Sequence, residues 1–179
     1  MNIDNLKNIL SDVQSGGLDL DAAMKALRHL PFEDIEFAVV DHHRHLRQGA
    51  PEVIYSEGKT PEQVKAIAGR IIAAGSDVLA TRAGREIFEA LKEMDGRAVY
   101  HEAARCVVIR HAEKKPTDGV VLVITAGTTD IPVAEEAAVT AEALGSKVMR
   151  MYDVGVSGLH RLLSRKHDIF DARVIVVAA

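Results

Sequence analysis

The alternation of apolar strands with helical segments between residues 120 and 177 constrains the fold more than any other feature of this chain. Three apolar strand candidates, residues 120–125, 147–152 and 173–177, are separated by two segments of helical character. Strands that alternate with helices predict βαβ crossovers and a parallel sheet. Because such crossovers are right-handed, we expect the loops after the first two strands to lie at the same edge of that sheet.

These two loops carry the kinds of residue that bind nucleotides. Small residues let a backbone approach a phosphate, which hydroxyls and a helix N-terminus then hold. A neighbouring His and Arg add positive charge and a group that titrates near neutral pH. Asp130 can instead cap the helix that follows it. The candidate residues are Gly127, Thr128 and Asp130 in the first loop, and Asp153, Ser157, His160 and Arg161 in the second.

Composition narrows the class of protein and its partners. The chain has 179 residues, 47% of them hydrophobic, which is enough to bury a core. Its formal charge of −4 gives no electrostatic reason to bind nucleic acid or an anionic membrane. A single cysteine excludes an intrachain disulfide and favours a reducing compartment. Since no apolar run approaches the ~20 residues that cross a bilayer, we expect a cytoplasmic protein.

A polar segment, HAEKKPTDG at residues 111–119, separates two unlike halves. We therefore predict an N-terminal α/β domain over residues 1–112, a linker over 113–118 and a second domain over 119–179. The second domain is expected to be an incomplete parallel sheet of the flavodoxin-like type, because three strands are few for such a fold. In the first half, the patterns predict two short N-terminal helices, a helix that Thr60 and Pro61 begin, and another over residues 84–94.

Several polar residues of the first half are candidate ligand contacts. Arg44 and Arg47 are three residues apart, so one helical turn would place both guanidinium groups on one face, suited to a phosphate or carboxylate. A solvated surface turn explains them equally well. Thr81 and Arg82 follow one predicted strand and His101 ends another. These three are either ligand contacts or ordinary polar residues at strand ends.

Two other features of the first half invite catalytic interpretations that we do not favour. The tripeptide Asp41-His42-His43 matches the name of a metal-dependent phosphoesterase family, and such side chains do bind divalent metals. Adjacent side chains cannot all converge on one ion, however, and no second acidic motif is present, so we predict no metal site there. Cys106 opens an apolar strand, where a cysteine is more often core filler than a nucleophile.

The long motifs of the chain resemble a known family. VVLVITAGTTDIPVAEEAAVTAEALG followed by MYDVGVSGLHRLL is similar to the aminoimidazole ribonucleotide carboxylase (PurE-like) superfamily, with one extra residue before His160. The segments VDHHRHLRQGAPEVIYSEGKTPEQV, LATRA and YHEAARC resemble one branch of it. That branch contains the LarB-type pyridinium-3,5-biscarboxylate mononucleotide synthases of nickel-pincer cofactor synthesis, also labelled circadian phase modifier proteins. The resemblance covers essentially the whole chain.

The resemblance implies a specific activity. Such enzymes carboxylate the pyridinium ring of nicotinic acid adenine dinucleotide with carbon dioxide or bicarbonate and split the phosphoanhydride to release AMP. A cysteine thiolate adds to the ring and makes it nucleophilic. The loop residues above would hold the phosphate and ribose, and Arg44, Arg47, Thr81, Arg82 and His101 would contact the substrate from the first domain. No tightly bound cofactor is implied, the metal dependence is left open, and the full-length proteins form homo-oligomers.

The resemblance also implies that the family's nucleophilic cysteine and catalytic glutamate lie beyond Ala179, the last residue of the sequence. We therefore expect the chain as given to be an inactive fragment, with Cys106 in the wrong domain to replace the nucleophile. Two alternatives remain. One is an ordinary aminoimidazole ribonucleotide carboxylase, against which the additional first domain argues. The other is a nucleotide-binding or regulatory module without catalytic activity.

Overall fold

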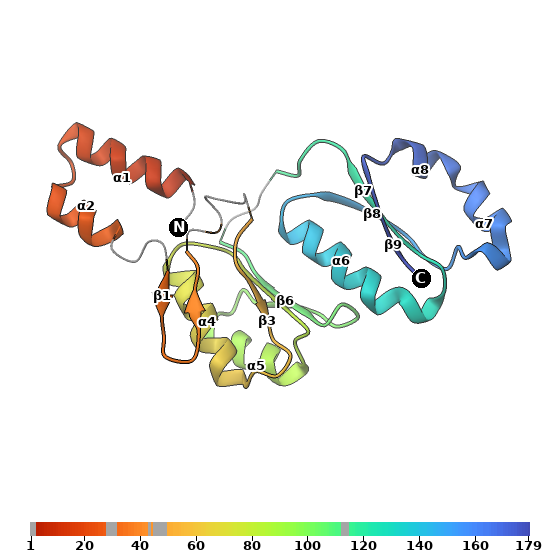
Figure 1. The fold of residues 1–179 in the computed structure, drawn as a ribbon, viewed down its shortest axis with the longest axis horizontal. Coiled ribbons are helices and arrows are strands. Elements are labelled where there is room, and N and C mark those ends of the chain that lie inside the picture. Colours follow the sequence, from red (N-terminus) through yellow and green to blue (C-terminus); the bar gives the residue numbers. More distant parts are fainter. Residues whose placement is uncertain (1–2, 28–31, 43, 45–49, 112–114) are drawn as a thin grey trace.

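Two sheets that share helix α6 as a common layer form the main body of the chain in the computed structural model (Figure 1). The structure describes residues 3–27, 32–42, 44, 50–111 and 115–179. Arg47, His43 and part of the predicted linker lie outside these residues.

The N-terminal residues form two helices, α1 (Ile3–Ser15) and α2 (Leu20–Leu27), which lie side by side at the upper left of the molecule, away from the first sheet (Figure 1). Gly16 adopts a positive φ of 77° and ends α1, as a residue without a side chain does most readily. The carboxylate of Asp19 accepts the amide of Ala22 at 2.7 Å and so caps α2. Both helices were predicted from the spacing of their apolar residues.

The first sheet has four strands in the order β3 (Val53–Tyr55), β4 (Val78–Thr81), β6 (Cys106–Ile109) and β5 (Val99–His101). β3 and β4 run parallel, and the other two pairs are antiparallel. Helices α4 (Pro61–Ala73) and α5 (Arg85–Met94) bury their apolar residues against one face of this sheet. A short antiparallel ladder of β1 (Glu33–Asp34) and β2 (Val39–Val40) precedes it.

Helix α4 begins where the sequence predicts. The hydroxyl of Thr60 accepts the amide of Gln63 at 3.3 Å, and the Gln63 side chain accepts the amide of Thr60 at 3.1 Å. This reciprocal arrangement satisfies two amides that the first turn leaves without partners, and Pro61 fits the first helical position because it has no amide hydrogen.

The second sheet is parallel throughout, as predicted. β7 (Val120–Thr125) lies between β8 (Lys147–Met151) and β9 (Val174–Ala178). Helix α6 (Ile131–Ala143) covers one face, and α7 (Leu159–Ser164) with α8 (Lys166–Asp171) covers the other. The sequence pattern predicted one helical segment between β8 and β9, which the structure divides into α7 and α8 at Arg165 (φ −110°).

Helix α6 packs against both sheets. Ala134 and Ala138 contact Val123 in the second sheet, and the other side of the helix packs Val139 and Ala143 against the first sheet. A helix that is apolar on more than one side is buried between layers. The predicted α/β fold class is confirmed, and α6 joins the two sheets through one apolar layer.

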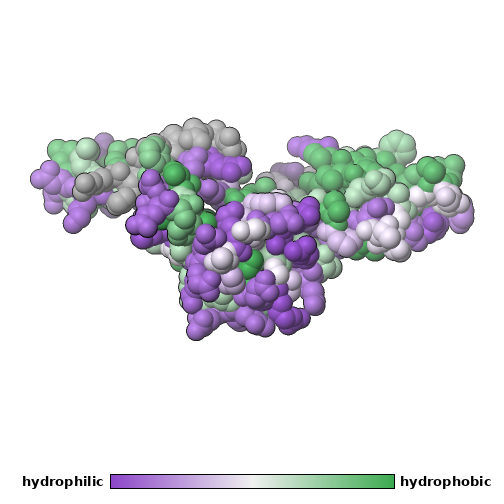
Figure 2. Space-filling model, turned by 60° about the horizontal axis from the view of Figure 1, so that its bottom comes forward, coloured by the Kyte–Doolittle hydropathy of each residue, from purple (hydrophilic) through white to green (hydrophobic). Residues whose placement is uncertain are grey.

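Apolar side chains remain on the surface over the last helices and strand. Figure 2 shows hydrophobic surface gathered in the right-hand part of the molecule, which contains residues 119–179. Val156, Phe170 and Val177 are among the exposed apolar residues there. In the part of the chain that the structure describes, no helix has both the length and the apolarity that a membrane span requires.

Candidate functional site

The loops after β7 and β8 meet at the carboxyl edge of the second sheet. The amide of Val154 donates to the carbonyl oxygen of Thr125 at 3.0 Å, and the amide of Gly155 donates to that of Ala126 at 2.8 Å. The buried hydroxyl of Thr125 accepts the amide of Asp153 at 2.9 Å. The sequence predicted that these loops share one edge, and these bonds bring them into backbone contact.

Gly155 allows the loops to approach this closely. A Cβ atom at this position would lie 2.6 Å from the carbonyl oxygen of Ala126 and 3.3 Å from its carbonyl carbon. Both contacts are with backbone, which cannot move aside as a flexible side chain can. Only glycine therefore fits here without separating the two loops.

The first loop forms a 3-10 turn, Thr128–Asp130, directly before α6. The carboxylate of Asp130 accepts the amide of Gly127 at 2.8 Å, so it closes this turn and makes no side-chain bond to the amides of α6. The alternative prediction that Asp130 caps α6 through its side chain is therefore wrong in detail. Thr128 and Thr129 are exposed at the start of the turn, where amides of a helical first turn lack partners within the helix.

The second loop is organised around an ion pair. Asp153 adopts a left-handed φ of 57°, and its carboxylate contacts Nη1 of Arg161 at 2.5 Å. The Arg161 side chain folds back over Gly158, where a Cβ atom would lie 2.5 Å from Nε of Arg161. Ser157 is exposed in the turn before α7, and His160 is exposed in the first turn of α7. The seven loop residues predicted to bind a nucleotide thus share one edge of the sheet, and their role in binding stays a prediction.

Arg82 and His101 of the first half lie toward α6 and β8. Arg82 has a left-handed φ of 53° and forms an ion pair through Nε with Glu136 of α6 at 2.7 Å. His101 ends β5, and burial lowers its pKa, while the nearby carboxylate of Glu142 acts in the opposite direction. Thr81 is buried at the end of β4. Among the described residues, the interactions of Arg82 and His101 with the second half run to α6 and β8 and not to the two loops.

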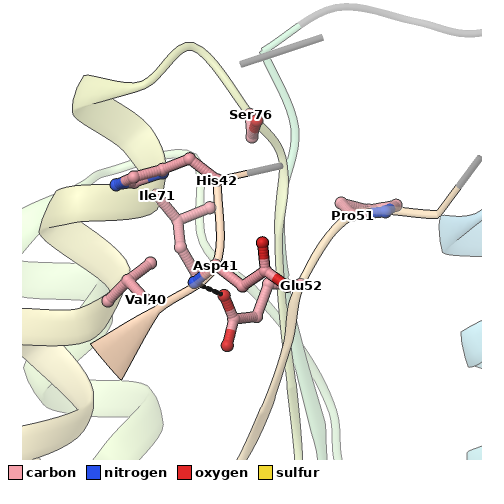
Figure 3. Close-up of a pocket in the computed structure, with 7 residues that line it drawn as sticks. All are labelled: Val40, Asp41, His42, Pro51, Glu52, Ile71 and Ser76. Carbon is pink, nitrogen blue, oxygen red and sulfur yellow. Dashed lines mark hydrogen bonds between the residues drawn. The ribbon is translucent and has the colours of Figure 1, made fainter. Parts of the chain in front are cut away.

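Asp41 and His42, the two described residues of the predicted Asp41-His42-His43 segment, point in different directions (Figure 3). The His42 ring lies 3.2 Å from the carboxylate of Glu33 and points away from Asp41 and Glu52 (Figure 3). The amide of Asp41 donates to the Glu52 carboxylate (Figure 3). The adjacent cavity of about 10 Å³ has room for roughly one water molecule and not for a substrate. Within the described ranges, no three His, Cys, Asp or Glu side chains form a metal-binding group.

Cys106 is fully buried beneath α6, and its thiol contacts the carbonyl oxygen of Ala104 at 3.3 Å. Burial raises the pKa of this thiol to about 12, and the nearby carboxylate of Glu136 adds to the effect. Since the thiolate is the nucleophilic form, Cys106 is not suited to attack a substrate.

The position at which β9 ends is relevant to the catalytic residues that the resemblance implies. β9 runs to Ala178, whose carbonyl oxygen accepts the amide of Ala126 at 3.1 Å, and Ala179 follows it directly. The last strand therefore ends at the same edge of the sheet as the loops after β7 and β8. Residues that follow Ala179 would start close to those loops. That the family's cysteine and glutamate are among them stays a prediction.

A charged network beside α6 was missed from the sequence. Arg150 of β8 contacts both carboxylate oxygens of Glu142, at 2.6 and 3.1 Å, and also binds Glu135 at 3.1 Å. The hydroxyl of Tyr152 donates to Glu135 at 2.7 Å. The spacing in the sequence could have indicated this network. Glu135 and Glu142 are seven residues apart on the helix, and Arg150 and Tyr152 are two residues apart at the strand, so each pair lies on one side of its element. This network fixes α6 against the edge of the second sheet.

Two comparisons with known proteins bear on the resemblance. Residues 32–112 match the family model described as LarB/PurE-like N-terminal domain. This match supports a relationship of the chain to the PurE-like superfamily. The chain is also 33% identical over 167 residues to the uncharacterized protein MJ0165 of Methanocaldococcus jannaschii. That alignment covers 88% of this chain, and the chain spans 64% of the length of this relative.

Proposed function

We propose that the two loops at the carboxyl edge of the second sheet bind nicotinic acid adenine dinucleotide, for carboxylation of its pyridinium ring with release of AMP. The observation that carries this proposal is the backbone contact at Gly155, which holds the two loops together beside the start of a 13-residue helix. Ligands of open parallel sheets bind outside the carboxyl ends of the strands. The match to a LarB/PurE-like domain supports a carboxylase-type enzyme.

The residues of these loops suit a nucleotide with phosphate groups. The amides of Thr128 and Thr129 and the positive end of the α6 dipole favour a phosphate. The Arg161 guanidinium would add charge-assisted hydrogen bonds, and the carboxylate of Asp130, which already accepts the amide of Gly127, would accept a ribose hydroxyl. Carbon dioxide or bicarbonate would be the second substrate.

The thiolate chemistry of the family is not assigned to Cys106, because burial keeps this thiol protonated and out of reach. The same observation favours a second candidate function for the 179-residue chain, that of a nucleotide-binding module without turnover. Both candidates require the dinucleotide to bind in the same place, so binding is the first property to test.

Titration calorimetry with the dinucleotide tests the proposal, and Gly127→Val is the informative variant. A Cβ at Gly127 would make ordinary contacts, 3.5 Å from Asp130 and 3.8 Å from Thr129, and its φ of −129° suits any residue. The variant should therefore fold normally while its side chain blocks a phosphate. We expect the wild-type chain to bind and Gly127→Val to bind at least roughly tenfold more weakly, a difference of about 1.4 kcal/mol.

Gly96→Ala, on a turn of the first half where no described atom lies within 4 Å of the added Cβ, is the matched control and should bind normally. Equal affinity of Gly127→Val and wild type would place the site elsewhere. Chromatographic detection of AMP after incubation with dinucleotide and bicarbonate then tests for turnover. AMP release by this chain identifies an enzyme. Binding without AMP release fits both the module and the inactive fragment that the resemblance implies, and the same assay on the full-length protein separates these two.

A further inference from the structure

The charged side chains of the two loops are not those expected of a site for a doubly charged anion. Three charged side chains lie in residues 126–130 and 152–161: the carboxylates of Asp130 and Asp153 and the guanidinium of Arg161. One positive group against two negative groups gives the side chains of these loops a net negative charge, which opposes the attraction of the α6 dipole for a phosphate. A site built to hold a doubly charged phosphate would be expected to carry an excess of positive groups.

Asp153 is held in place from two directions. Its amide donates to the buried hydroxyl of Thr125, and its carboxylate contacts Arg161. Gly158 permits this pairing, because a side chain there would collide with the Arg161 guanidinium. The Asp153 carboxylate is thus a fixed part of the loop.

The pair is also accessible to a ligand. The Asp153 side chain is 45% exposed and that of Arg161 41% exposed. A phosphate that binds the remaining N–H groups of Arg161 must then lie close to the Asp153 carboxylate. The repulsion between these two anions grows with the charge on the phosphate.

We propose that Asp153 determines the charge of the phosphate that this site accepts, favouring a singly charged phosphate over a doubly charged terminal one. The inference rests on the proposed function and specifies its substrate class. Each phosphate of a dinucleotide's phosphoanhydride carries one negative charge, whereas a phosphate monoester carries close to two at pH 7. A mononucleotide with a terminal phosphate is then bound more weakly than the dinucleotide.

The test uses two ligands that differ by one methyl group and one charge: nicotinic acid mononucleotide and its phosphate methyl ester. Their affinities are measured by calorimetry at pH 8 for the wild-type chain and for Asp153→Asn. Asparagine tolerates the left-handed backbone at this position and retains the shape of the side chain. Asp168→Asn is the matched control, since Asp168 of α8 forms a similar, partly buried ion pair with Arg165 at 2.8 Å.

We expect the wild-type chain to bind the methyl ester several-fold more tightly than the monoester. Asp153→Asn should raise the affinity for the monoester roughly tenfold, equivalent to about 1.4 kcal/mol, and that for the ester only about threefold, because the ester carries half the charge. Asp168→Asn should behave as the wild type.

A wild-type preference for the monoester would overturn the inference. So would an equal weakening of both ligands by Asp153→Asn, because Asp153 would then only position Arg161. If the dinucleotide binds and the ligand pair shows no charge preference, the inference alone fails. If the dinucleotide and both mononucleotide ligands fail to bind, the proposed function fails together with it.

Discussion

Replacing Gly155 with alanine perturbs the contact on which the site depends. The backbone at this residue, with φ −59° and ψ 160°, accommodates alanine without strain. The added Cβ, however, would lie 2.6 Å from the carbonyl oxygen of Ala126, so one loop must move away from the other. The hydrogen bond from the Gly155 amide to that oxygen, now 2.8 Å, would lengthen or break.

The expected loss of stability follows from three contributions. Forcing an additional carbon into a packed contact costs about 1–3 kcal/mol, and loss of the hydrogen bond costs about 1 kcal/mol. Replacing glycine restricts the unfolded chain, which offsets about 0.4–1 kcal/mol. We therefore expect the free energy of unfolding to fall by about 1–3.5 kcal/mol.

Urea denaturation followed by circular dichroism measures this difference. Gly96→Ala is the control, because its added Cβ meets no described atom within 4 Å, and its stability should stay within about 1 kcal/mol of wild type. Coincident unfolding curves for Gly155→Ala and the wild type would show that the loops are not in contact as the structure describes, and would refute this reasoning.

Three further predictions concern the rest of the chain. Thr60→Ala removes the side-chain acceptor that caps α4 and should lower the free energy of unfolding by about 1 kcal/mol in a urea titration; no change would contradict the cap. Because burial raises the pKa of Cys106 to about 12, iodoacetamide at pH 8 should label it only after unfolding, and rapid labelling of the native chain would contradict its burial. Hydrogen bonds from Arg97 lower the pKa of Asp95 to about 2, so its stabilising effect is present above its usual pKa of 3.8 and is lost as the pH falls toward 2. Asp95→Asn should thus lose less stability than the wild type between these pH values in acid-unfolding measurements, and equal losses would contradict the pairing.

Local signals in the sequence predicted the elements that carry them. Thr60 and Pro61 marked the start of α4, because the residues that cap a helix act over a few neighbouring positions. The parallel second sheet followed from the alternation of its strands and helices. β1 was missed because a strand of two residues, Glu33 and Asp34, shows no periodicity.

The arrangement of the elements could not be predicted in the same way. Periodicity shows that α6 has apolar residues but not that Ala134 faces one sheet and Val139 the other. The left-handed backbone at Arg82 likewise could not be predicted, because arginine rarely adopts this conformation. For the candidate site, the sequence predicted the two loops, whereas the approach at Gly155 and the pairing of Asp153 with Arg161 required the structure.

The central claim is that a dinucleotide binds between the loops after β7 and β8. Amide chemical shifts of the ¹⁵N-labelled chain, followed during titration with nicotinic acid adenine dinucleotide, test this claim residue by residue. We predict saturable shifts at Gly127, Thr128 and Thr129 and at residues 153–161, with little change in α4 and α5. An unchanged spectrum, or shifts confined to the first sheet and its helices, would contradict the account.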